Sequence, residues 1–198
     1  MKTTARAVLA TFPLAVGAQA PSGPIPPVDE QVAAAVLPLP ADLRVDATVL
    51  GYKTAGKLEV LRQGKNGLRC LALYVTRPDF HVACYHESLE AFMARGRELR
   101  DKGVTSQTAV DSIRFAEIAS GKLKMPQQAA LYSLTAKDKK AWDPATKKVT
   151  GATPLGVVYM PFATSETVGL SANPATKGPW IMFPGTAKAH VMIVGSMQ

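Results

Sequence analysis

The sequence lacks the short motifs by which the commonest enzyme classes are recognised. It contains no glycine-rich phosphate loop, no G-x-S-x-G nucleophile elbow, no H-E-x-x-H pair and no paired-cysteine zinc pattern. These absences argue against nucleotide chemistry, against the common serine-hydrolase arrangement and against the best-known zinc-protease arrangement. Histidine is scarce as well, because only three occur in 198 residues.

Long hydrophobic runs are also missing, and none reaches the roughly 20 residues that a membrane-spanning helix needs. The first twenty residues are instead typical of a secretory signal. The basic residues Lys2 and Arg6 precede a short apolar run over residues 7–18, and residues 18–20 form an A-x-A cleavage site. We therefore expect a secreted or periplasmic protein without a membrane span, whose mature chain begins near Pro21.

A buried N-terminal helix is the alternative for residues 1–20. Pro13 interrupts the apolar run and a proline-rich segment follows it, so the sequence favours the signal. No cysteine stands directly after the cleavage site, where Pro21 is found, and a lipid anchor at the new N-terminus is unsupported.

Cysteine is limited to Cys70 and Cys84. Disulfides persist in oxidising compartments, so export predicts a bridge between them. Such a bridge closes a loop of about 15 residues, for which the chain-entropy model gives roughly 3 kcal/mol. The alternative is two free thiols, one of them catalytic, and the two readings exclude each other because a bridged sulfur is no nucleophile.

Basic residues are in excess, with 23 Lys and Arg against 15 Asp and Glu for a net charge of +8. In an export compartment this balance favours acidic lipids, glycans or solubility rather than nucleic acid. One lysine-rich segment, residues 137–148, has only Trp142 as an aromatic neighbour and is typical of a solvated face. We therefore expect no nucleic-acid partner.

The mature chain divides into a proline-rich leader over residues 21–40, with a short helix at 28–37, and a single domain over 41–198. In the domain, residues 48–52, 58–62 and 68–75 favour strands. Asn66-Gly67 precedes the third of these, and Asn-Gly is a preferred tight turn. We therefore expect the second and third strands to form an antiparallel hairpin.

A loop over residues 76–83 and then an amphipathic helix should follow. The helix is indicated by apolar residues at the spacing of one face and by Gly103 as its C-terminal cap; the face comprises Leu89, Phe92, Met93, Gly96 and Leu99. With Cys84 just before this helix, the disulfide would join helix to sheet. A second helix is expected from a Thr108/Asp111 capping box to Gly121.

The rest of the chain favours strands punctuated by proline and glycine, over residues 129–134, 149–150, 155–160, 180–183 and 190–193. Strands, two helices and more strands predict an α+β fold: a mainly antiparallel sheet, two central helices packed on one face, and one disulfide.

Three stretches, GKNGLRC, ACYHESLEAFMARGRELR and PWIMFPGTAKAHVMI, resemble a family of secreted two-cysteine bacterial proteins with no assigned activity. The resemblance covers roughly residue 58 to the C-terminus and implies export and the disulfide, but no chemistry. Leu68 stands where tryptophan is common in that family, and Ala187 where proline is common.

The histidines supply the candidate metal ligands. His86 and Glu90 are four residues apart and would share a helical face, with His190 as a third ligand. His190 and Met192 would share a strand face, to which Met182 could add a sulfur, a combination that suits copper. The ordinary alternatives are a capping or solvated histidine and core methionines. His81 is expected to be exposed.

Catalysis without a metal would rest on His86 or His190 beside Glu87 or Glu90, with Tyr85 and Lys188 in support. Because no catalytic signature stands out, we expect a non-catalytic exported protein that binds a small ligand, a glycan or an envelope partner. The alternative is a transition-metal-binding protein or metalloenzyme that uses copper or zinc at His86, Glu90 and His190. Oligomeric state is not indicated.

Overall fold

The computed structural model of the chain describes residues 24–73 and 77–194. The predicted secretory signal and the alternative helix over residues 1–20 lie outside the described residues. Within the described ranges, no helix is both long and apolar enough to cross a membrane.

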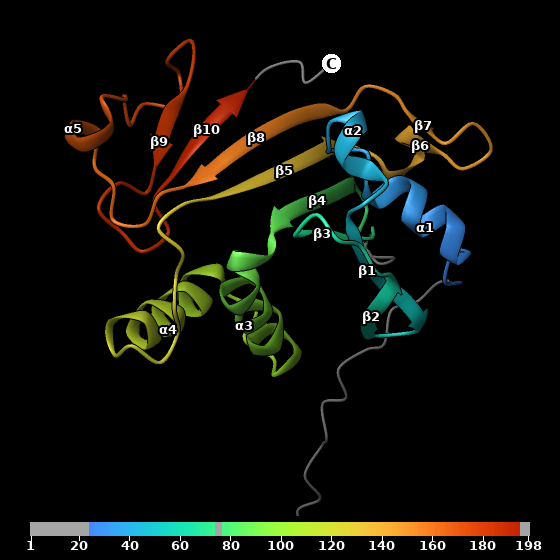
Figure 1. Cartoon of the computed structure of the whole chain (residues 1–198), viewed down its shortest axis with the longest axis horizontal. Helices are drawn as coiled ribbons and strands as arrows, with labels where there is room; N and C mark the ends of the chain where they lie inside the picture. The colour runs from blue at the N-terminus through green and yellow to red at the C-terminus, as the bar shows by residue number, and fades with distance from the viewer. Residues whose placement is uncertain (1–23, 74–76, 195–198) are drawn as a thin grey trace, which may run out of the picture.

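One eight-stranded sheet runs through the described part of the chain in the order β2-β1-β3-β4-β5-β8-β10-β9 (Figure 1). Neighbouring strands are antiparallel except β1 and β3, which are parallel. The strands are β1 (Thr48–Thr54), β2 (Lys57–Arg62), β3 (Leu68–Leu71), β4 (Phe80–His86), β5 (Ala129–Ala136), β8 (Thr153–Tyr159), β9 (Trp180–Met182) and β10 (His190–Val194), with a separate ribbon of β6 (Trp142–Asp143) and β7 (Lys148–Val149). The predicted α+β fold with a mainly antiparallel sheet is confirmed.

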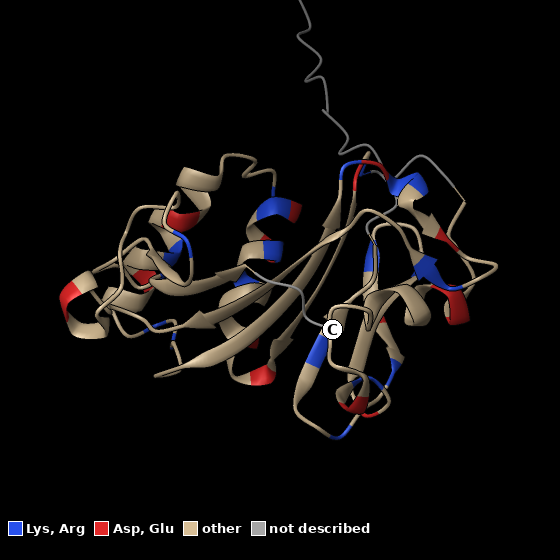
Figure 2. Ribbon diagram, turned by 90° about the horizontal axis from the view of Figure 1, so that it is seen from above, with Lys and Arg blue, Asp and Glu red and all other residues tan. Residues whose placement is uncertain are grey.

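Helices lie on both faces of this sheet (Figure 1). The predicted pair, α3 (Glu90–Asp101) and α4 (Gln107–Ala119), covers one face, where Phe92 packs with Tyr85 and Val157. The other elements are α1 (Val28–Ala35), α2 (Ala41–Arg44), α5 (Ser165–Val168) and the 3-10 turns η1 (Glu87–Leu89) and η2 (Lys139–Ala141). Strands β4, β5, β8, β9 and β10 carry no Lys, Arg, Asp or Glu (Figure 2).

The short helix predicted at residues 28–37 is present as α1, and it belongs to the core. Ala35 and Leu39 are 0% and 1% exposed. The Gln31 side chain bonds to both backbone groups of Tyr52 in β1, at 2.8 and 2.9 Å. Residues 28–39, which the sequence placed in a leader, therefore pack against the sheet.

The hairpin predicted between residues 58–62 and 68–75 is wrong. β2 instead folds back on β1 through Ala55-Gly56, where Thr54 pairs with Lys57 and Gly56 has φ +74°. Gly64, just after β2, allows a close backbone crossing: a Cβ on Gly64 would lie 2.2 Å from the Asp46 carbonyl oxygen. The chain then enters β3 on the far side of β1.

The loop predicted over residues 76–83 is also wrong in its second half, because β4 begins at Phe80. Phe80, Val82 and Cys84 are buried on one face of β4, at 0–1% exposure, while Tyr85 is buried on the other. A strand covered on both faces lacks the apolar and polar alternation that reveals a half-exposed strand.

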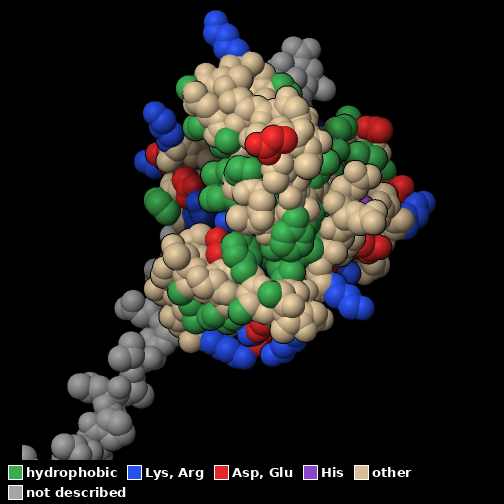
Figure 3. All heavy atoms as spheres, turned by 90° about the vertical axis from the view of Figure 1, so that its left-hand side faces the viewer, with side chains coloured by type: hydrophobic (Ala, Val, Ile, Leu, Met, Phe, Trp, Pro, Cys, Tyr) green, Lys and Arg blue, Asp and Glu red, His purple; other side chains and the backbone are tan. Residues whose placement is uncertain are grey.

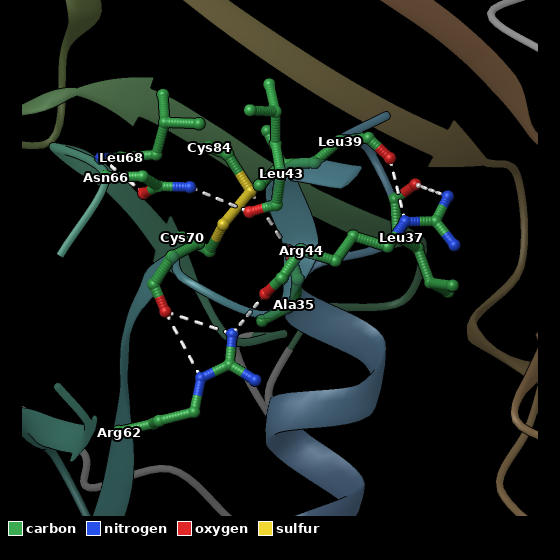
Figure 4. Close-up of a disulfide and its surroundings, with 11 residues drawn as sticks. Ala35, Leu37, Leu39, Leu43, Arg44, Arg62, Asn66, Leu68, Cys70 and Cys84 are labelled. Atoms are coloured by element: carbon green, nitrogen blue, oxygen red, sulfur yellow. Dashed lines mark hydrogen bonds between the residues drawn. A yellow bond between two sulfur atoms is a disulfide. The ribbon is translucent and has the colours of Figure 1, made fainter. Parts of the chain in front are cut away.

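The Cys70–Cys84 disulfide is confirmed, but its architectural role differs from the prediction. Cys70 of β3 and Cys84 of β4 are direct cross-strand partners, so the bridge joins strand to strand rather than helix to sheet. Both cysteines are 0% exposed, beneath α1 and the segment that follows it (Figure 4). Arg62, at the end of β2, donates two hydrogen bonds to the Ala47 carbonyl, at 3.0 and 3.2 Å. These bonds hold the start of β1 against β2.

The buried face predicted for α3 is confirmed: Leu89, Phe92 and Leu99 are 0–5% exposed, and Gly103 has φ +87°. The cap predicted for α4 is not formed by Thr108 and Asp111. Ser106 caps this helix instead, with its hydroxyl accepting from the Ala109 N–H. The Asp111 carboxylate accepts from Gln107 and Arg114 of the same helix and from Lys188 outside it.

Candidate functional site

His86 and His190 lie on opposite faces of the sheet. His86 is the last residue of β4 and lines an open groove of about 600 Å³ together with Leu43, Tyr132 and Val158. His190 is the first residue of β10 and pairs with Tyr159, whose side chain belongs to the core under α3 and α4. Side chains alternate across a strand, so the register keeps the two imidazoles apart.

His86 acts as a cap for the 3-10 turn η1. Its ring Nδ1 accepts from the Ser88 N–H at 3.3 Å and lies 2.9 Å from the Ser88 hydroxyl. Because His86 belongs to β4 and not to a helix, it does not share a helical face with Glu90. Glu87 is exposed beside it.

Glu90 belongs to a closed hydrogen-bonded triad. It accepts from the Tyr85 hydroxyl at 2.7 Å and from Arg97 at 2.6 Å, and Arg97 also donates to the Tyr85 oxygen at 3.0 Å. Burial raises the pKa of Tyr85, and the neighbouring Glu90 adds to that rise against the opposing effect of Arg97. This arrangement stabilises the junction between β4 and α3 and occupies both Glu90 oxygens.

A metal centre made by His86, Glu90 and His190 is therefore not formed. Among the described residues, no group of three or more His, Cys, Asp or Glu side chains is placed to hold a metal ion. His81, expected to be exposed, is half-buried on β4 and lies 2.9 Å from the Thr135 hydroxyl.

The structure brings together a different set of charged side chains, between α4 and the segment before β10. The Asp111 carboxylate pairs with Arg114 and, at 2.8 Å, with the Lys188 ammonium group. The exposed fractions of these side chains are 16% for Asp111, 6% for Arg114 and 15% for Lys188. We refer to Asp111, Arg114 and Lys188 as the charge cluster.

Arg114 is the buried centre of the charge cluster. Its guanidinium lies 3.7 Å from the centre of the Phe92 ring and donates to the Phe92 carbonyl at 3.2 Å, while its Nε has no hydrogen-bond partner among the described residues. Gly96 makes room, since a Cβ there would lie 3.0 Å from Arg114 Nη1. Burial alone would raise the pKa of Asp111, but hydrogen bonds from Gln107, Lys188 and Arg114 outweigh it and lower that pKa.

His190 adjoins the charge cluster. Its Nδ1 lies 2.7 Å from the Lys188 carbonyl, which can only accept, so Nδ1 carries the proton in the neutral ring. Burial lowers the pKa of His190, and the nearby Lys188 charge lowers it further against the opposing hydrogen bond. The ring centre lies 5.0 Å from that of Tyr159 and 5.8 Å from that of Phe183.

Two exposed phenylalanines lie at the same end of the sheet. Phe162 and Phe183 are 58% and 42% exposed, and both have left-handed backbones, with φ +66° and +55°. Their loops are joined by hydrogen bonds from Phe162 N–H to Thr186 O and from Gly185 N–H to Ala163 O, each 2.8 Å. We refer to Phe162 and Phe183 as the aromatic pair.

The aromatic pair borders the charge cluster, because the Lys188 ammonium lies 4.5 Å from the centre of the Phe183 ring. This end of the molecule faces the viewer in Figure 3, where hydrophobic side chains gather between the upper part, which carries α5, and the lower part, which carries α4. A left-handed backbone costs an L-residue about 1–2 kcal/mol. The sheet end thus holds two bulky apolar side chains in a costly conformation at the surface.

Sequence reasoning named His190 and Lys188 but missed Asp111 as a functional residue, Arg114 and the aromatic pair. Arg114 had a usable signal, because it falls four residues after Val110 on the side of the helix that should be buried. For the aromatic pair the sequence carries only a weak signal. Pro161 and Pro184, next to the two phenylalanines, indicate turns but do not indicate that the rings are exposed.

Comparison of the chain with protein-family models, with curated proteins and with solved structures finds no match. The resemblance to secreted two-cysteine proteins therefore stays a prediction, and the functional argument rests on the charge cluster, His190 and the aromatic pair.

Proposed function

We propose that this chain is an exported, non-catalytic binding protein and that the aromatic pair contacts an oligosaccharide. Export is supported by the signal-like N-terminal sequence and by the buried Cys70–Cys84 disulfide, since disulfides persist mainly in oxidising compartments.

The observation that carries the proposal is the combination of exposure and backbone conformation at Phe162 and Phe183. A phenylalanine at positive φ is an outlier, and glycine would fit either position at a lower cost. Such outliers cluster where a backbone is held for binding. Neither ring is buried enough for core packing to explain its conformation. We therefore attribute the two left-handed backbones to a contact between the rings and a ligand.

An oligosaccharide fits the surroundings of the rings. The apolar faces of sugars pack on aromatic rings, and their hydroxyl groups need fixed hydrogen-bond donors and acceptors at the edge of that contact. Beside Phe183, the Lys188 ammonium offers such a donor, held in place at 2.8 Å by the Asp111 carboxylate. The excess of basic residues is compatible with an acidic glycan.

The test is isothermal titration of the purified mature chain with soluble oligosaccharides, including peptidoglycan glycan fragments and β-linked glucose oligomers. We expect at least one class to bind, and Phe162→Gly and Phe183→Gly each to weaken that binding by about tenfold, the value of one aromatic contact. Val60→Gly is the matched control, because Val60 is 43% exposed on β2 at the other edge of the sheet.

Unchanged affinity in both phenylalanine variants would contradict the proposed contact surface. A wild-type chain that binds no member of the panel would contradict the ligand class.

A further inference from the structure

The register of β9 and β10 places four side chains at the corners of one square on the sheet. His190 pairs with Met182, and Met192 pairs with Trp180. Residues two apart on a strand share a face, so all four side chains project from the same face, the one on which His190 contacts Tyr159. We refer to Trp180, Met182, His190 and Met192 as the β9–β10 square.

We infer that the β9–β10 square binds monovalent copper, with the His190 imidazole and the thioethers of Met182 and Met192 as ligands. Directly paired positions have Cβ atoms about 4.5–5.5 Å apart, which lets a histidine and a methionine reach toward one ion from neighbouring strands. This inference does not depend on the oligosaccharide proposal.

The donor set selects a soft ion. Thioether sulfur and imidazole nitrogen favour Cu(I), whereas Ca²⁺ and Mg²⁺ need oxygen ligands. The four corners of the square include no carboxylate.

One nitrogen of the His190 imidazole is already held by a hydrogen bond. Its Nδ1–H donates to the Lys188 carbonyl at 2.7 Å, so Nε2 carries the free lone pair. Fixing one ring nitrogen on a carbonyl is how proteins set the tautomer and orientation of ligand histidines. The Lys188 ammonium beside the ring is paired with the Asp111 carboxylate.

The two methionines of the square lie on the last two strands at one edge of the sheet. Met182 and Met192 are only partly buried, and β9 is the last strand at its edge of the sheet. Met93 and Met125 pack against the core under α3 and α4, as Met192 also does, but they lie outside the β9–β10 square and therefore serve as internal controls.

The experiment is an anaerobic titration of the mature chain with Cu(I) in competition with bicinchoninate, repeated on Met182→Leu/Met192→Leu and on Met93→Leu/Met125→Leu. Leucine conserves the volume of methionine, so both double variants should keep the fold, which thermal unfolding checks. We expect one Cu(I) per chain and a loss of more than about 100-fold in affinity for the first variant only, since even an outer-shell partner is worth 10–100-fold.

Methyl-¹³C methionine NMR gives a second readout, in which Cu(I) should shift the Met182 and Met192 signals and leave those of Met93 and Met125 in place. Equal losses in the two double variants, shifts at Met93 or Met125 instead, or a wild-type chain that does not compete with bicinchoninate would each overturn the inference. None of these outcomes depends on the response of Phe162 variants to oligosaccharides.

Discussion

Replacing Phe162 by glycine and by alanine tests whether its backbone is strained in favour of an exposed ring. Both variants lose the same ring, so the difference between them isolates the backbone. At φ +66°, alanine retains the cost of about 1–2 kcal/mol that an L-residue pays in the left-handed region, and glycine does not. Glycine in turn lowers stability by about 0.5–1 kcal/mol, because its unfolded chain has more conformational freedom to lose on folding. Phe162→Gly should therefore be more stable than Phe162→Ala by about 0.5–1 kcal/mol.

The control is the same pair of substitutions at Val60, which is 43% exposed on the regular strand β2. There the order should reverse, because glycine in a strand interior is less stable than alanine by about 0.5–1 kcal/mol. Urea unfolding of the four variants measures both differences. If Phe162→Gly is less stable than Phe162→Ala, as at Val60, the left-handed conformation is not a cost to the fold and the reasoning for a binding role fails.

The remaining predictions concern the core and the charges. Replacing Cys70 and Cys84 together by alanine should lower the free energy of unfolding by about 3 kcal/mol, the entropy of a loop with 14 residues of separation; a loss below about 1 kcal/mol in urea would contradict this. Because burial sets the folded pKa of His190 below its ordinary 6.5, the unfolded chain binds the proton more readily. Stability should therefore fall as pH drops through about 6.5 toward the folded pKa, and His190→Asn, which can still donate to Lys188, should flatten that part of the pH profile. An unchanged profile in unfolding titrations would rule this out. Arg114→Met should cost about 3 kcal/mol, since it leaves the buried Asp111 carboxylate with one cation fewer, and adding Asp111→Asn should recover part of the loss. Strict additivity in that double-mutant cycle would refute the coupling.

Elements with local signals could be predicted from the sequence. The face of α3 follows from residues at helical spacing, and β8, β9 and β10 are bounded by prolines and glycines that end strands. The disulfide follows from two cysteines and an inferred compartment. In each case the deciding information lies within about ten residues or in the composition of the whole chain.

The predictions that were wrong concern features that depend on distant parts of the chain. Asn66-Gly67 has the composition of a hairpin turn, yet Gly64 is needed for a backbone crossing over Asp46, which no local pattern reveals. β4 was missed because both of its faces are covered, one by α1 and the other by α3, and periodicity then carries little information.

The predicted site at His86 and His190 was wrong for a similar reason. Whether His86 and His190 meet depends on the register of the intervening strands β5 and β8, and a shift of one residue exchanges the two faces of a strand. The contact of Lys188 with Asp111 joins positions 77 residues apart. Only its local half, the i,i+3 pair of Asp111 and Arg114, could be read from spacing.

The most direct test of the central claim, that the β8–β10–β9 end of the sheet is the binding surface, is chemical-shift mapping by NMR with the tightest-binding oligosaccharide. The account predicts that the shifts centre on Phe162, Phe183 and Lys188. Shifts that centre instead on His86, Tyr132 and Val158, which line the groove on the opposite face, would contradict it.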